Sequence, residues 1–105
     1  MEKPNIAYIE ELAGGDESFK TKILDILKEE FPEEKKSYHT NLNSGNFELT
    51  ADNVHKLKHK ISILGLDKSY EIAVAYEDNL REGSKALSSE FESILQTITN
   101  YLENL

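Results

Sequence analysis

Apolar side chains recur along this chain at intervals of three and four residues, the spacing of one face of an α-helix. The clearest case is the stretch 88–105, which a serine at 88 or 89 can cap. No stretch alternates apolar and polar residues for long enough to predict a β-strand. The apolar positions of this helix are Phe91, Ile94, Leu95, Ile98, Tyr101, Leu102 and Leu105.

The same spacing predicts further helices at about 4–12, 16–44, 47–65 and 68–82, separated by turns that contain glycine. Each has one apolar stripe and an otherwise polar surface, which is typical of helices that pack around a shared core. We therefore predict an all-α fold, an antiparallel four-helix bundle with a short extra N-terminal helix, over a single domain 1–105.

Three residues bear on where these helices begin and break. Asp16 and Asp67 are good N-caps for the second and fourth helices. Pro32 lies inside the second, where proline normally kinks or breaks a helix. Tyr38 nevertheless continues the apolar stripe in phase, so we expect one long kinked helix or two abutting ones.

Composition narrows the class of protein. The chain of 105 residues has a formal net charge of -8 and no cysteine. The absence of cysteine excludes disulfides and thiolate zinc sites, and no apolar run is long enough to cross a bilayer. An acidic chain repels phosphate backbones. We expect a cytoplasmic monomer that binds neither nucleic acid nor membranes.

One stretch departs from the acidic average. Residues 53–66 contain three lysines, two histidines and no acid, a charge of +3, which leaves -8 - 3 = -11 on the remaining residues. At about 100° per residue, the predicted helix turns a second stripe away from its core face. That outward stripe is His55, Lys58, His59 and Ser62.

An exposed neutral imidazole is a nucleophile that needs no separate base. A lysine one turn further along the helix can offset the negative charge of an arriving phosphoryl group. His55 followed by Lys58 therefore suits the capture of a phosphoryl group.

The central motif resembles a known family. Residues 54–58 read Val-His-Lys-Leu-Lys, and Leu-Gly follows at 64–65, ten residues after the histidine. This is similar to the signature of histidine-containing phosphotransfer (HPt) domains, which is His-x-Leu-Lys with a later Leu-Gly. Leu-Ala-Gly-Gly-Asp at 12–16 is similar to the family's opening, and Tyr-Glu at 76–77 lies where the family usually has Leu-Glu.

The resemblance implies a phosphocarrier in a two-component phosphorelay. His55 would take the group from the aspartyl phosphate of a receiver domain and pass it to a second receiver, and Lys58 would stabilise the phosphoryl group. Gly65 would allow close packing or a helix end. The partners would be receivers, and a hybrid kinase is a further candidate partner. The receiver would bring Mg²⁺, so this chain would need no cofactor and would be neither a kinase nor another enzyme.

The chain departs from the family pattern after the lysine. The family usually has glycine there, which leaves room for the receiver, whereas this chain has His59, followed by Lys60 and Ile61 in place of small residues. An alternative function is therefore an HPt-like interaction module that binds a receiver or kinase domain and blocks or scaffolds signalling without transferring phosphate.

The remaining residues near the motif have several interpretations. Lys56, His59 and Ser62 would belong to the docking surface. Ile63 and Leu66 lie about 140 to 160° from the core face, so they would form either an apolar docking patch or ordinary helix-end contacts. The two histidines, four residues apart, could also hold a metal ion. Because their stripe carries no acid and the neighbouring lysines repel cations, we expect no metal site.

Overall fold

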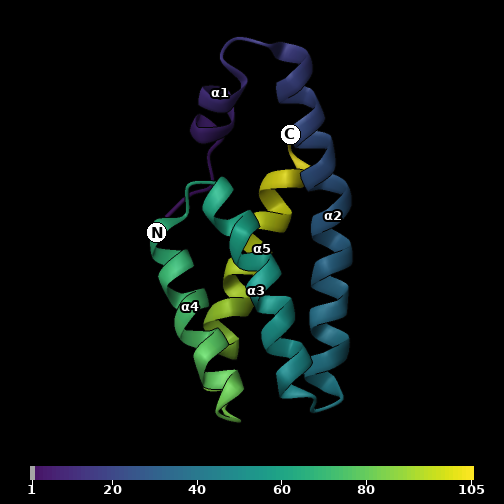
Figure 1. Cartoon of the computed structure of the whole chain (residues 1–105), viewed down its shortest axis with the longest axis vertical. Helices are drawn as coiled ribbons and strands as arrows, with labels where there is room; N and C mark the ends of the chain where they lie inside the picture. Colours follow the sequence, from purple (N-terminus) through teal and green to yellow (C-terminus); the bar gives the residue numbers. More distant parts are fainter. Residues whose placement is uncertain (1) are drawn as a thin grey trace.

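The computed structural model describes residues 2–105 and confirms the all-α bundle, with no strand in that range. Four long helices are joined by tight turns, and the short first helix lies beside the upper half of the longest one (Figure 1). No helix within residues 2–105 combines the length and the apolar character that a membrane span requires. The helices are α1 (Ala7–Ala13), α2 (Glu17–Asn43), α3 (Phe47–Ile63), α4 (Asp67–Arg81) and α5 (Ser88–Glu103).

The longest helix, α2, is one element rather than two. It runs from Glu17 to Asn43 with Pro32 inside it. Its start is the predicted one, since the Asp16 carboxylate accepts a hydrogen bond from the backbone N–H of Phe19 (3.1 Å). It provides one wall for most of the length of the bundle (Figure 1).

The core consists mainly of the apolar stripes that the spacing predicts, but Leu105 is wrongly included, since it lies beyond the end of α5 and is exposed. On α3, Val54, Leu57 and Ile61 are fully buried, which fixes the opposite face of this helix toward solvent. Two tyrosines meet at the centre, where the hydroxyl groups of Tyr38 and Tyr76 lie 2.7 Å apart and share one hydrogen bond. α3 packs mainly against α4 and α2, so the side chains at the edges of its outer face border these two helices.

Two predicted caps are wrong. α4 begins with Leu66 in the cap position and α5 with Leu87, and neither helix has a side-chain cap of its own. The role that we assigned to Asp67 belongs to Glu2. Its carboxylate accepts hydrogen bonds from the backbone N–H groups of Lys68 (2.8 Å) and Ser69 (2.9 Å). Sequence spacing could not reveal a cap that comes from the other end of the chain.

The N-terminal segment also secures the turn after α3. The backbone N–H of Asn5 donates to the carbonyl of Leu64 (2.9 Å), and its side chain lies against Gly65. Gly65 has φ +74°, and a Cβ there would come within 2.6 Å of Asn5 Nδ2. Glycine therefore serves both a left-handed turn and a close approach.

Candidate functional site

His55 lies on the outward face of α3 with its side chain 51% exposed. Its Nδ1 lies 3.3 Å from Oε1 of Glu77 on α4, the shortest polar contact that the ring makes with another helix. The fully buried Val54 and Leu57 beside it on α3 fix the direction in which it points. The ring is thus accessible to a partner but is oriented by a contact beneath it.

Glu77 is the centre of this site. Its side chain is only 12% exposed, and besides His55 it accepts hydrogen bonds from Lys58 Nζ (3.1 Å) and from Arg81 Nη2 (3.0 Å). Burial opposes ionisation of the carboxyl. The hydrogen bonds from Lys58, Arg81 and His55 outweigh it and hold the pKa of Glu77 below its usual 4.5. Glu77 is therefore a carboxylate at neutral pH.

The charge of Glu77 decides which nitrogen of His55 is free. An ionised carboxylate only accepts hydrogen bonds, so Nδ1 of a neutral His55 must carry the proton. The lone pair then lies on Nε2, at the other side of the ring. The arrangement leaves Nε2 of His55 able to act as a nucleophile or as a ligand.

Lys58 lies one turn after His55 and is less exposed than the outward stripe suggested. Its side chain is 13% exposed, and Nζ lies 5.8 Å from the centre of the Tyr70 ring, within the range of a cation–π contact. Its ammonium is thus held close to the same carboxylate that orients His55. Lys58 therefore places its positive charge beside the nearly buried Glu77, below the exposed ring of His55, and not at the protein surface.

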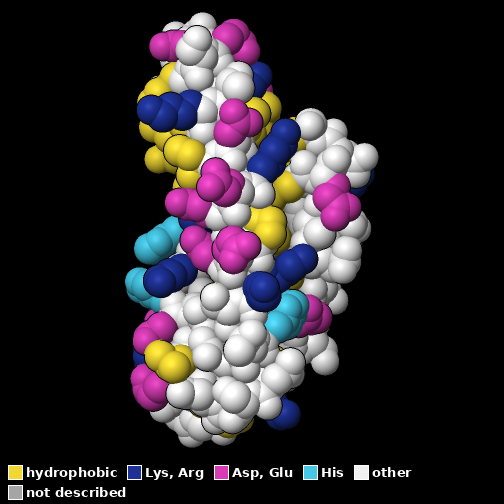
Figure 2. Space-filling view, turned by 90° about the vertical axis from the view of Figure 1, so that its right-hand side faces the viewer, with side chains coloured by type: hydrophobic (Ala, Val, Ile, Leu, Met, Phe, Trp, Pro, Cys, Tyr) yellow, Lys and Arg dark blue, Asp and Glu magenta, His cyan; other side chains and the backbone are white. Residues whose placement is uncertain are grey.

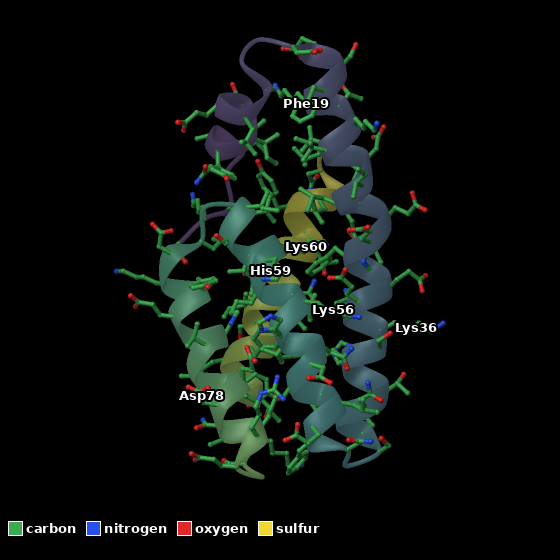
Figure 3. All side chains as sticks on the ribbon, viewed as in Figure 1. Phe19, Lys36, Lys56, His59, Lys60 and Asp78 are labelled. Atoms are coloured by element: carbon green, nitrogen blue, oxygen red, sulfur yellow. The ribbon has the colours of Figure 1, made fainter. Side chains whose placement is uncertain are left out.

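His59 lies beside His55 on the next turn of α3. The two ring centres are 5.2 Å apart with an interplanar angle of 72°, and both residues are exposed. Figure 2 shows histidine side chains next to a lysine or arginine side chain at the left edge of the view, and Figure 3 labels His59 on α3. The residue that departs from the family pattern is therefore in contact with the candidate phosphoacceptor.

An open cleft adjoins His55 on the side toward the α2–α3 turn. Its cationic side chains are Lys56 and Arg81, and Leu49 supplies an apolar part of its wall. Lys56 is exposed, in keeping with its predicted place on the docking surface.

The predicted basic island is largely neutralised. Lys60 Nζ lies 2.8 Å from Glu30 Oε1 and 3.1 Å from Glu34 Oε2, both on α2. Lys58 is paired with Glu77 on the other side of α3. The charge of +3 counted along the sequence is therefore wrong as a description of this surface, because acids from neighbouring helices fold against two of the three lysines.

The apolar docking patch is also corrected. Leu66 is only 1% exposed and belongs to the core, and Ile63 is half-buried against it. The helical angle that placed Leu66 outside does not apply, since α3 ends at Ile63 and the turn at Gly65 redirects the chain. Ser62 is exposed as predicted.

Sequence reasoning missed the roles of Glu77 and Arg81. Glu77 entered only as part of a flanking match, and Arg81 only as part of a turn. Their spacing of four residues on one helix, acid before base, was an available signal for an ion pair. Nothing in the sequence placed that pair under His55.

The structure brings no larger set of metal ligands together. Within residues 2–105, no group of three or more histidine and acidic side chains could hold a metal ion. His39, which we could not place from the sequence, lies 2.7 Å from Glu92 of α5 through its Nε2.

Comparison with known proteins gives one match. The family model described as Hpt domain matches residues 22–105, which covers α3, α4, α5 and most of α2. No curated protein and no solved structure matches the chain.

Proposed function

The chain belongs to the Hpt domain family, and we propose that it is a phosphocarrier in which His55 holds the phosphoryl group between two receiver domains. Hpt domains are phosphotransfer modules of two-component signalling that interact with receiver domains and kinases, and in general they carry phosphate rather than act as enzymes. The observation that carries the proposal is a half-exposed histidine whose Nδ1 contacts a nearly buried carboxylate.

The transfer step follows from the tautomer of His55. Nε2 attacks the phosphorus of a receiver's aspartyl phosphate, the N–P bond forms, and the bond between phosphorus and the aspartyl oxygen breaks. The electron pair of the broken bond leaves on the aspartate, which becomes a carboxylate. The proton on Nδ1 stays in place, and Glu77 balances the positive charge that develops on the ring. The reverse step passes the group to the second receiver.

Lys58 and the partner supply the remaining electrostatics. Lys58 lies one turn from His55 and offsets the charge of the phosphoryl oxygens. We expect Mg²⁺ to come with the receiver and this chain to need no cofactor of its own. The relay would take place in the cytoplasm with a monomeric carrier, and a hybrid kinase is a further candidate partner.

The direct test uses a panel of phosphorylated receiver domains and follows acid-labile, base-stable label on this chain. His55→Gln should abolish labelling. The matched control is His39→Gln, on a different helix, which should label like the wild type. Equal labelling of the His55→Gln variant would overturn the assignment.

The contact between His59 and His55 favours one other function, an Hpt-like module that binds a receiver or kinase and blocks or scaffolds signalling. His59→Gly restores the residue that the family usually has. Binding of a receiver without labelling of the wild type, together with a large gain of labelling in His59→Gly, would support the non-transferring module. Wild-type labelling that His59→Gly leaves unchanged supports the carrier.

A further inference from the structure

We propose that His55 and His59 together form a binding site for a divalent transition-metal ion of the imidazole-preferring class, such as Zn²⁺ or Cu²⁺. The two rings project from successive turns of α3, are exposed, and have their centres 5.2 Å apart. Two histidines four residues apart on one helix are a recurrent metal-binding element.

The separation of the rings agrees with shared coordination. A Zn–N bond is about 2.1 Å, and the centre of an imidazole lies about 1.1 Å beyond the bonded nitrogen, so each ring centre would lie about 3.2 Å from the ion. With the tetrahedral angle that zinc favours, two such centres are about 5 Å apart. The rings of His55 and His59 already have this separation.

Glu77 supplies the supporting contact that metal-binding histidines usually have. A ligating histidine typically donates its second N–H to a carboxylate, which fixes the tautomer and makes the other nitrogen a better donor. Nδ1 of His55 makes this contact with Glu77 at 3.3 Å, so Nε2 is the free donor. The proposed site therefore has two histidine ligands, and the carboxylate of Glu77 orients one of them, His55.

The electrostatic objection from the sequence is weaker in the fold. The lysines at 56, 58 and 60 were expected to repel a cation. The ammonium of Lys58 is bonded to Glu77 and that of Lys60 to Glu30 and Glu34, each within 3.1 Å, so these two charges are balanced by acids. Lys56 stays exposed beside the site.

Metal binding has a consequence that rests on the proposed function. An ion on Nε2 of His55 occupies the lone pair that attacks phosphorus, so a metal-loaded chain cannot accept a phosphoryl group. His59, in place of the family's glycine, thereby makes the phosphoacceptor sensitive to transition metals.

The first experiment measures binding alone, by calorimetric titration of Zn²⁺ and of Cu²⁺ into the purified chain. We expect one ion per chain, at least tenfold weaker binding in His59→Ala, and no change in His39→Ala. Glu77→Gln should weaken binding about tenfold. Mg²⁺, which prefers oxygen ligands, should not bind. Wild-type affinity in His59→Ala, or no binding of either ion, would overturn the proposal. Circular dichroism checks that each variant is folded.

The second experiment measures transfer from a phosphorylated receiver with and without Zn²⁺, comparing wild type with His59→Gln. Because both use the same receiver, any effect of the metal on the receiver cancels. Inhibition should be at least tenfold stronger for the wild type and reversed by a chelator; equal inhibition of both chains overturns the masking role. If His55 proves not to accept phosphate, the calorimetry still decides whether the metal site exists.

Discussion

On either side of α3 a lysine lies nearly buried and is ion-paired with an acid of a neighbouring helix. Toward α4, Lys58 meets Glu77, and Arg81 completes what we call the α4 seam. Toward α2, Lys60 meets Glu30 and Glu34, which form the α2 seam. Both lysine side chains are 13% exposed and both have an acid within about 3 Å, so burial and pairing alone do not distinguish them.

The two seams differ in the other contacts that their glutamates make. Glu77 also contacts Nδ1 of the half-exposed His55, whereas among residues 2–105 Glu30 and Glu34 hold only Lys60. One carboxylate oxygen of Glu34 is even buried without a hydrogen-bond partner among residues 2–105. We infer that the α2 seam only joins two helices. The α4 seam joins two helices and also fixes the tautomer of His55, the proposed nucleophile.

The strongest test of this difference exchanges one acid in each seam for its amide. Glu77→Gln removes the charge that fixes the tautomer of His55 and balances the ring during transfer. We expect labelling of His55 to slow by about tenfold or more, since hydrogen bonds to charged groups are each worth about 1.5–3 kcal/mol. The measurement is the initial rate of transfer from a phosphorylated receiver.

The matched control is Glu34→Gln in the α2 seam. It changes the same chemical group on the opposite side of α3 and should leave the transfer rate within about twofold of wild type. Equal slowing in both variants would mean that the rate follows the stability of the bundle and not the contact with His55.

The second test replaces each of the two lysines by methionine, which keeps an apolar side chain of similar length but removes the charge. Lys58→Met should slow transfer about fivefold, because it removes a cation that shares the Glu77 carboxylate with His55. Lys60→Met should leave transfer unchanged but lower the free energy of unfolding by about 1 kcal/mol, the upper end for ion pairs that reach solvent, since two acids lose their partner. Unfolding in urea and transfer rates on the same preparations separate the two effects. Slower transfer in Lys60→Met would contradict the assignment of a purely structural role to the α2 seam.

These comparisons also show where sequence reasoning succeeds. Periodicity placed Val54 and Leu57 in the core and His55 outside, because each follows from the geometry of one helix. Leu66 was misplaced because the same angle was carried past the turn at Gly65. The pairing of Lys60 and the position of Glu77 under His55 depend on how neighbouring helices sit against α3, and no local pattern contains that information.

The third test uses pH, since the group with a shifted pKa titrates at the acid end of the scale in the α4 seam and at the alkaline end in the α2 seam. Hydrogen bonds from Lys58, Arg81 and His55 outweigh burial and lower the pKa of Glu77 below 4.5. Its contribution to stability is therefore present above about pH 4.5 and lost as the pH falls through the lower folded pKa. Burial lowers the pKa of Lys60, but the hydrogen bonds that its ammonium donates to Glu30 and Glu34 outweigh this and raise the pKa above 10.5. Its contribution is present below about pH 10.5 and lost as the pH rises through the higher folded pKa.

The measurement is the unfolding free energy of wild type, Glu77→Gln and Lys60→Met across pH. The difference between wild type and Glu77→Gln should shrink on the acid side, and that between wild type and Lys60→Met on the alkaline side. Differences that stay constant across both windows would show that these ion pairs do not contribute as described.

The smallest expected effect is that of replacing Arg81. This variant tests whether a residue that contacts Glu77, but not His55, affects phosphoryl transfer. Arg81 contacts Glu77 as Lys58 does, but its side chain is 37% exposed and it also reaches Glu48 and Asp52. In Arg81→Ala the carboxylate keeps Lys58 and His55, so transfer should change by less than about twofold. Exposed ion pairs contribute little to stability and are screened by salt, so the loss of stability should be small and should fall further as salt is added. If Arg81→Ala instead slowed transfer as much as Glu77→Gln, the open cleft beside His55 would be the part that receives the partner. The α4 seam would then influence phosphoryl transfer through the charge that it presents to the partner and not by fixing the tautomer of His55.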